Sequence, residues 1–230
     1  RNMTDVTTGL PIVIGSRSPR RLELLQLIAD PSRLVVLPPR DADEPGFDGL
    51  VEMAEFEARC HEIVELKRQD VIRQLAEGTR PTATEQGCVV VCADTTVIVK
   101  DQSGKLLALG QPNEQSDWQT EVRGWFRDYL AGQTHFVLSA VSVSLCSETG
   151  NVGRTLKQSC VTSVTMRDDI DEWLDWYIAT GEPLGKAGGY AIQGAGSVMV
   201  TKVEGSYSNV VGLPIENTVE MLRQIGALPS

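Results

Sequence analysis

The stretch that most constrains the fold covers residues 88–99 and reads Cys-Val-Val-Val-Cys-Ala-Asp-Thr-Thr-Val-Ile-Val. Its first six residues are apolar and mostly β-branched, a pattern typical of a strand that is buried on both faces of a sheet. Asp94 follows at once. We therefore expect its carboxylate at or near the end of a buried strand, on the rim where α/β sheets bind ligands.

Three roles are open for Asp94 on this stretch alone. A buried carboxylate suits the work of a general base, whereas a nearby metal ion would hold the same group ionised as a ligand. The structural alternative is an aspartate that merely starts a turn. The choice among these roles depends on what the rest of the chain places beside Asp94.

Composition excludes several classes of protein. The 230 residues are enough for one large domain or two small lobes, and 41% of them are apolar, which disfavours disorder. The sequence contains no run of 18 apolar residues and no signal-peptide pattern, so we expect no membrane partner. The formal net charge of −10 disfavours nucleic acid as a partner, and it makes any local cluster of basic residues informative.

Cysteine and histidine usage narrows the compartment and the chemistry. The five cysteines are odd in number and do not have the spacing of a zinc motif, which favours a reducing cytoplasm. The two histidines, His61 and His135, are far apart in the sequence. A histidine-based zinc site and a Ser-His-Asp triad are therefore both disfavoured.

The first anion-binding candidate is a strand that turns into a helix. Residues 10–14 are apolar, Ser18 suits the N-cap of the following helix, and Pro19 suits its first position. Arg20 and Arg21 then fall in the first turn, where they oppose the helix dipole unless an anion is bound there. The alternative is a pair of solvated arginines. The spacing of a P-loop is absent.

Two further segments carry candidate ligands. Residues 41–46, Asp-Ala-Asp-Glu-Pro-Gly, supply three carboxylates that could hold Mg²⁺ or form a solvated loop. Residues 185–196 are rich in glycine and contain a lysine and a glutamine, so their backbone can approach a ligand closely. A flexible linker is the alternative for this second segment, although its tyrosine and isoleucine argue against it.

The remaining pattern predicts alternating strands and helices. Helices are expected at 50–76, from Asn113 to Leu130, from Asp168 or Asp169 to Ile178, and at 215–225. Strands are expected at 34–37, 97–99, 106–109, 136–146, 156–166 and 198–203. We expect one domain over residues 1–230, with residues 1–9 as a flexible N-terminal tail.

Four motifs in one order resemble the Maf family of nucleoside triphosphate pyrophosphatases. The first is Ser-Arg-Ser-Pro-Arg-Arg-Leu-Glu-Leu-Leu at 16–25, and the second is Ala-Asp-Thr at 93–95. The third covers 177–184 and 186–194, Tyr-Ile-Ala-Thr-Gly-Glu-Pro-Leu and Lys-Ala-Gly-Gly-Tyr-Ala-Ile-Gln-Gly. The last is Glu-Gly-Ser-Tyr-Ser-Asn-Val-Val-Gly-Leu-Pro at 204–214.

The resemblance implies an elongated, Maf/ITPase-like α/β fold, in which helices flank a mixed sheet and two lobes enclose a central cleft. It implies a cytoplasmic homodimer that uses Mg²⁺ or Mn²⁺ to hydrolyse a nucleoside triphosphate to the monophosphate and pyrophosphate. The implied catalytic residues are Asp94, Arg20, Lys67 and Gln193. The implied substrate-binding residues are Ser16, Ser18, Arg21, Thr95, Gln111 and Lys186, and the implied metal-linked residues are Glu44 and Asp94.

The same motifs resemble the family branch associated with dTTP and UTP, and a modified pyrimidine nucleotide would also fit. Two positions depart from the family pattern: Gln111 replaces a lysine, and Gly185 replaces an aspartate. Lys105 is our candidate to supply the missing cation. Two other functions stay open: a weakened nucleotide-binding protein with a role in cell division and septum formation, and a phosphoesterase that releases orthophosphate.

Overall fold

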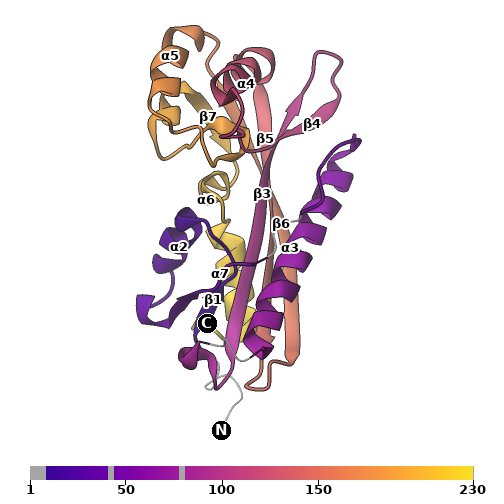
Figure 1. Ribbon diagram of the computed structural model, residues 1–230, viewed down its shortest axis with the longest axis vertical. Helices are drawn as coiled ribbons and strands as arrows, with labels where there is room; N and C mark the ends of the chain where they lie inside the picture. The colour runs from indigo at the N-terminus through magenta and orange to yellow at the C-terminus, as the bar shows by residue number, and fades with distance from the viewer. Residues whose placement is uncertain (1–8, 41–43, 78–80, 230) are drawn as a thin grey trace.

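A computed structural model describes residues 9–40, 44–77 and 81–229, and shows an elongated molecule organised around one long sheet (Figure 1). Its strands are β1 (Ile12–Ile14), β2 (Leu34–Val36), β3 (Cys88–Lys100), β4 (Leu106–Leu109), β5 (Thr134–Cys146), β6 (Val152–Met166) and β7 (Val200–Glu204). Its α-helices are α2 (Pro19–Gln26), α3 (Met53–Ala76), α4 (Trp118–Trp125), α5 (Asp171–Ala179), α6 (Tyr207–Val211) and α7 (Ile215–Ile225). Five short helical turns connect them: η1 (Pro31–Arg33), η2 (Thr82–Thr84), η3 (Phe126–Leu130), η4 (Ala187–Gly189) and η5 (Ala195–Met199).

The strands form a mixed sheet in the order β2-β1-β3-β5-β6-β7, and β4 pairs with β3 off this path. The β2, β1 and β3 strands run parallel, and the other pairs are antiparallel. This confirms the predicted mixed α/β sheet flanked by helices.

The central strand β3 changes its neighbour partway along one edge. On that edge β1 pairs with Val89–Val91 and β4 pairs with Val97–Lys100. The stretch from Cys92 to Thr96 has no strand partner there among the described residues. The other edge of β3 pairs with β5 from Cys88 to Ile98. The interruption opens the sheet at its centre.

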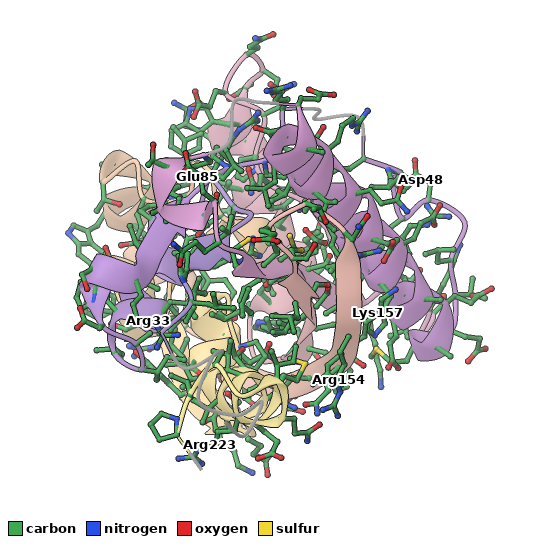
Figure 2. All side chains as sticks on the ribbon, turned by 90° about the horizontal axis from the view of Figure 1, so that it is seen from below. Arg33, Asp48, Glu85, Arg154, Lys157 and Arg223 are labelled. Atoms are coloured by element: carbon green, nitrogen blue, oxygen red, sulfur yellow. The ribbon has the colours of Figure 1, made fainter. Side chains whose placement is uncertain are left out.

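Helices divide the two faces of the sheet unequally. Seen from below, α3 and α7 lie on opposite sides of the sheet, with Lys157 marking β6 (Figure 2). On the α3 face, alternate β3 residues such as Val90 pack against helix residues such as Phe56 in one cluster. The opposite face carries two clusters, one around Val91 and Leu222 and one around Val97 and Val122 of α4. The two lobes are built around these two clusters, and one cavity is lined by residues of both, such as Ile192 and Val97.

The position of Asp94 differs from the prediction. We expected the strand to finish at or near this residue, but β3 continues to Lys100, so Asp94 lies in the middle of a strand. The hydrophobic pattern cannot show that the edge of β3 passes from β1 to β4 at this point. The exchange of neighbours leaves the edge of β3 at Asp94 without a strand partner among the described residues, as a strand end would have done.

Two predicted helix starts are wrong for local reasons. Asn113 does not cap α4, because its side chain accepts a hydrogen bond from the backbone N–H of Gln115 instead. Asp117 caps that helix, and its carboxylate accepts from the N–H of Thr120 at 3.2 Å. Neither Asp168 nor Asp169, the two expected caps, is the N-cap of α5, and the Asp169 carboxylate accepts two hydrogen bonds from the guanidinium of Arg167 instead. The N-cap is Ile170, and the helix starts at Asp171.

Two other predictions depend partly on residues outside the described ranges. The predicted tail, residues 1–9, lies outside them except for Gly9. The assignment of a single domain to residues 1–230 stays a prediction. Within the described ranges, none of the helices combines the length and the apolar character that a bilayer crossing needs.

Candidate active site

A cavity of about 600 Å³ lies where the edge of β3 is interrupted. Its walls come from the β1–α2 turn, α3, β3, the segment after β4, the glycine-rich loop and the end of α6. All eleven predicted site residues line it: Ser16, Ser18, Arg20, Arg21, Glu44, Lys67, Asp94, Thr95, Gln111, Lys186 and Gln193. The fold thus brings the four motifs to one place.

A lysine joins two carboxylates on the α3 side of the cavity. Lys67 projects from the middle of α3, and its Nζ lies 2.7 Å from Asp94 Oδ1 and 3.0 Å from Glu44 Oε1. The side chains of Lys67 and Asp94 are only 14% and 13% exposed. A charge pair this deeply placed is fixed in geometry, because each partner would be costly to leave alone. Asp94 therefore presents its second oxygen, Oδ2, in a fixed position.

The β1–α2 turn forms the wall beside this pair. Ser18 occupies the N-cap and Pro19 the first helical position, as predicted, but the Ser18 side chain makes no capping hydrogen bond. Ser16 Oγ instead accepts a hydrogen bond from the Ser18 N–H at 3.1 Å. The positive end of the α2 dipole therefore faces the cavity without a capping side chain of its own, which suits it to an anion.

The two arginines of α2 have different surroundings. Arg21 donates to Gly212 O at 2.9 Å, to Ser16 Oγ at 3.0 Å and to Thr95 Oγ1 at 3.2 Å. Burial lowers the pKa of Arg21, and the charge of Asp94 opposes that effect. Arg20 donates only its Nε, to Val211 O at 3.3 Å, among the bonds of the described residues. Arg21 thus organises the wall, while Arg20 keeps its terminal nitrogens for a ligand.

The cavity is positive within an acidic chain. Its described lining contains five basic side chains, Arg17, Arg20, Arg21, Lys67 and Lys186, and two acidic ones, Glu44 and Asp94. Burial lowers the pKa of Lys186, and the nearby charge of Arg20 lowers it further. An anionic ligand would relieve this crowding of positive charge.

The glycine-rich segment is an ordered wall, so the linker alternative is wrong. It contains the turn η4 and runs into the turn η5, and Gly188 N–H donates to Gly110 O at 3.0 Å. Tyr190 is 6% exposed and its hydroxyl lies 2.7 Å from Nε2 of the fully buried His135. The loop therefore presents Lys186 and Gln193 from a supported backbone.

Two contributors to the cavity were missed in the sequence. Arg17 lines it and donates to Pro39 O at 2.8 Å, which ties the β1–α2 turn to the segment that leads to Glu44. Residues 210–212 also line it, and the carbonyls of Val211 and Gly212 accept from the two arginines of α2. The motifs at 16–25 and 204–214 could have signalled both contributions.

The prediction that Lys105 supplies the missing cation is wrong. Gln111, which replaces a lysine of the family pattern, lines the cavity as expected. Lys105 lies in the turn between β3 and β4 and is not among the lining residues. Its N–H donates to Asp101 within that turn, which holds the segment together locally.

Glu44 and Asp94 are chemically suited to a divalent cation. Both offer carboxylate oxygens, and both contact Lys67, so they converge on one point. Mg²⁺ is commonly held by one or two carboxylates together with substrate phosphate oxygens, and this donor set fits that pattern. No cluster of three or more His, Cys, Asp or Glu suited to a metal occurs in the described part of the chain. Asp41 and Asp43 of the predicted acidic loop lie outside that part.

Comparisons with known proteins agree on one family. The model of the family described as Maf-like protein matches residues 11–225. A dTTP/UTP pyrophosphatase of Anaeromyxobacter dehalogenans is 36% identical over 94% of this chain and 94% of its own length. A protein of the same name from Alcanivorax borkumensis is 39% identical over 92% of this chain and 93% of its own length. Another, from Nitratidesulfovibrio vulgaris, is 35% identical over 96% and 91%.

These matches cover nearly the whole chain and include every element that lines the cavity. The chain belongs to the Maf-like protein family.

Proposed function

We propose that this protein is a nucleoside triphosphate pyrophosphatase that hydrolyses a pyrimidine nucleotide of the dTTP or UTP type. Modified pyrimidine nucleotides are included in this substrate class. The products are the nucleoside monophosphate and pyrophosphate. The observation that carries the proposal is one cavity in which a lysine-held carboxylate lies beside a positive, anion-ready helix terminus. The names of the relatives support the choice of nucleotide.

In the proposed reaction, water attacks the α-phosphorus and the bond to the α–β bridging oxygen breaks. The water oxygen stays on the monophosphate, and the bridging oxygen leaves with pyrophosphate. Asp94 accepts a proton from the water at Oδ2, because Oδ1 already accepts a hydrogen bond from Lys67. Lys67 thereby keeps the base oriented, in the way that a fixed partner orients a catalytic group.

The other wall binds and orients the triphosphate. Arg20 and Lys186 neutralise phosphate charge, and Ser16, Ser18 and Gln193 offer hydrogen-bond groups to phosphate or sugar oxygens. Arg21 holds Ser16 and Thr95 in place. Gln111 offers a neutral hydrogen bond where a cation is usual in the family.

The proposal includes a divalent cation, Mg²⁺ or Mn²⁺, held by Glu44 and Asp94. When bound, such a cation would offset negative charge that develops on the phosphate oxygens.

The proposal also includes a cytoplasmic homodimer. The five cysteines, all without a disulfide, support a reducing compartment, and light scattering of the purified protein tests the dimer.

The test is product identification. Purified protein is incubated with dTTP, UTP, CTP and GTP plus Mg²⁺ or Mn²⁺, and the phosphorus products are resolved by ³¹P NMR. We expect monophosphate and pyrophosphate, with faster turnover of dTTP and UTP. Orthophosphate would instead indicate a phosphoesterase, and binding without products would indicate a nucleotide-binding protein.

Two variants sharpen this test. Asp94→Asn should abolish turnover while nucleotide binding persists. Asp128→Asn is the matched control, because Asp128 is exposed in η3 and lies outside the cavity lining. Equal activity of Asp94→Asn and the unchanged protein would overturn the assignment of the base.

A further inference from the structure

A carboxylate lies behind the glycine-rich loop and outside the cavity lining. Glu182 follows α5, and its two oxygens accept hydrogen bonds from two consecutive backbone amides. Oε2 accepts from Ala195 N–H at 2.6 Å, and Oε1 accepts from Gly196 N–H at 2.9 Å. Hydrogen bonds to an ionised carboxylate are shorter and stronger than neutral ones, so this contact is a firm one.

A buried tyrosine adds a third connection. The Tyr177 hydroxyl lies 3.1 Å from Glu182 Oε1 and 3.0 Å from Gly189 O, and its single hydrogen can be donated to one of them at a time. Burial raises the pKa of Tyr177, and the charge of Glu182 raises it further, so the hydroxyl stays a donor. Tyr177 thus links the carboxylate to the middle of the loop.

These contacts close residues 182–196 into a ring. Glu182 stands at the start of that segment, and the amides that it binds stand at the end. Lys186 and Gln193 lie between the two ends, and both line the cavity. Closing a loop in this way restricts the positions that its side chains can take.

The glycines at the end of the ring allow the approach. A Cβ on Gly194 would lie 2.1 Å from Glu182 Oε2, and a Cβ on Gly196 would lie 2.9 Å from Ala191 O. A side chain at Gly194 would therefore push the carboxylate away. The lack of a Cβ at Gly194 therefore leaves the space that the Glu182 carboxylate occupies.

We propose that Glu182 is a positioning residue that sets the binding wall of the cavity by closing the loop that carries Lys186 and Gln193. The inference rests on the proposed function, because that function gives Lys186 and Gln193 a nucleotide to bind. Among the described residues, the hydrogen bonds of Glu182 and Tyr177 do not reach Lys67 or Asp94, which pair on the α3 side of the cavity. Loss of the ring should therefore weaken substrate binding far more than it slows the chemical step.

Glu182→Gln removes the charge and turns an amide NH₂ toward a backbone N–H, so that one contact is lost. We expect KM to rise about tenfold while kcat stays within about threefold. Gly194→Ala displaces the carboxylate but keeps its charge, and it should give the same split. Glu172→Gln on the exposed side of α5 is the matched control.

The pattern of the two variants separates the explanations. If only Glu182→Gln raises KM, the charge of Glu182 near Lys186 acts rather than the ring, and the proposal is wrong. A fall in kcat with KM unchanged would mean a smaller folded fraction, which also overturns it.

Hydrogen exchange keeps the proposal testable if the protein hydrolyses none of the nucleotides. Amides of residues 185–196 should exchange faster in Glu182→Gln and Gly194→Ala than in the unchanged protein and in Glu172→Gln. Unchanged exchange in that segment would rule out the ring, whatever the fate of the proposed reaction.

Discussion

The two walls of the cavity are built in different ways. Ser16, Lys67 and Asp94 belong to the wall formed by β1, α2, α3 and β3, where sheet ladders and two buried clusters hold the backbone. The second wall is the loop that carries Lys186 and Gln193, and no strand pairing is described for it. Hydrogen bonds of Glu182, of Tyr190 and of the Gly188 amide support it, together with the burial of Tyr190 and Ile192 in two of the clusters.

The difference predicts a division of labour. Positions in the first wall are set by the core, so the groups that act in the chemical step stand on the more rigid support. Positions in the second wall depend on a loop held by a few hydrogen bonds and a few buried side chains rather than by a strand ladder, which suits groups that bind and release a product. Variants in the two walls should therefore differ in what they change, and four experiments examine this.

The largest expected effect follows removal of the lysine of the first wall. Lys67→Met leaves Asp94 and Glu44 without the cation that contacts both, so the base loses its orientation and faces a like charge. We expect kcat to fall by about 10²–10³-fold. Steady-state kinetics check this, with Lys202→Met on the exposed face of β7 as the control. A change confined to KM would contradict the division of labour.

The second experiment tests how tightly the first wall is packed. A Cβ on Gly15 would lie 2.4 Å from Cys92 Sγ and 3.0 Å from a Val71 methyl group. Gly15→Ala should therefore lower the free energy of unfolding by about 1–3 kcal/mol. Urea unfolding measures it, and Cys92→Ala in the same chain should recover part of the loss. Additive losses in the double variant would show that the two residues do not compete for space.

The third experiment concerns the histidine behind the second wall. Burial lowers the pKa of His135 from 6.5 to about 4, so below neutral pH the unfolded chain binds a proton that the folded chain excludes. Stability should be fully present above pH 6.5 and should fall by roughly 2 kcal/mol between pH 7.5 and 5 from this group. The loss would continue until the pH passes below 4.

A double variant isolates that contribution. His135→Phe with Tyr190→Phe removes the titrating group and its hydroxyl partner together, so the dependence of unfolding free energy on pH should become shallower. Urea unfolding at pH 7.5, 6 and 5 measures it. His61 remains in both proteins and serves as the internal background. Equal slopes would show that His135 does not titrate as expected.

The smallest effect is expected at the lysine of the second wall. Burial and the charge of Arg20 lower the pKa of Lys186, so this side chain loses its charge at a lower pH than an ordinary lysine. KM for the nucleotide should rise in the alkaline range, at a lower pH than an ordinary lysine would give, with little change in kcat. In Lys186→Arg, which stays charged, KM should stay flat over that range. Parallel profiles would place the titration on another group.

Much of the site could be predicted because its residues are local to motifs. Ser16, Ser18, Arg20 and Arg21 stand in one turn, and a turn from strand to helix has few possible shapes. Lys67 and Gln111 depended on the family resemblance, since a helix face and a loop give no local signal. Their assigned roles stay predictions, although the fold brings them to the same cavity.

The failures have a common physical cause, which is competition between partners. Asp94 lies inside a strand because β3 pairs first with β1 and then with β4. Such long-range pairing cannot be predicted from a short apolar run. Asn113 and Asp169 have the right chemistry for caps, but other nearby donors occupy them. Local sequence propensity identifies the residues that could cap a helix, and tertiary contacts determine which of them does so.

The continuity of β3 also limits how this cleft can close. Domain closure usually needs a hinge of a few residues at which two bodies rotate. Here β3 and β5 pass from one lobe to the other without a break, and they are joined by a hydrogen-bond ladder from Cys88 to Ile98. Rotation of the lobes would have to bend this ladder. Any enclosure of the substrate is therefore left to the segments that border the cavity, with the sheet serving as a fixed frame.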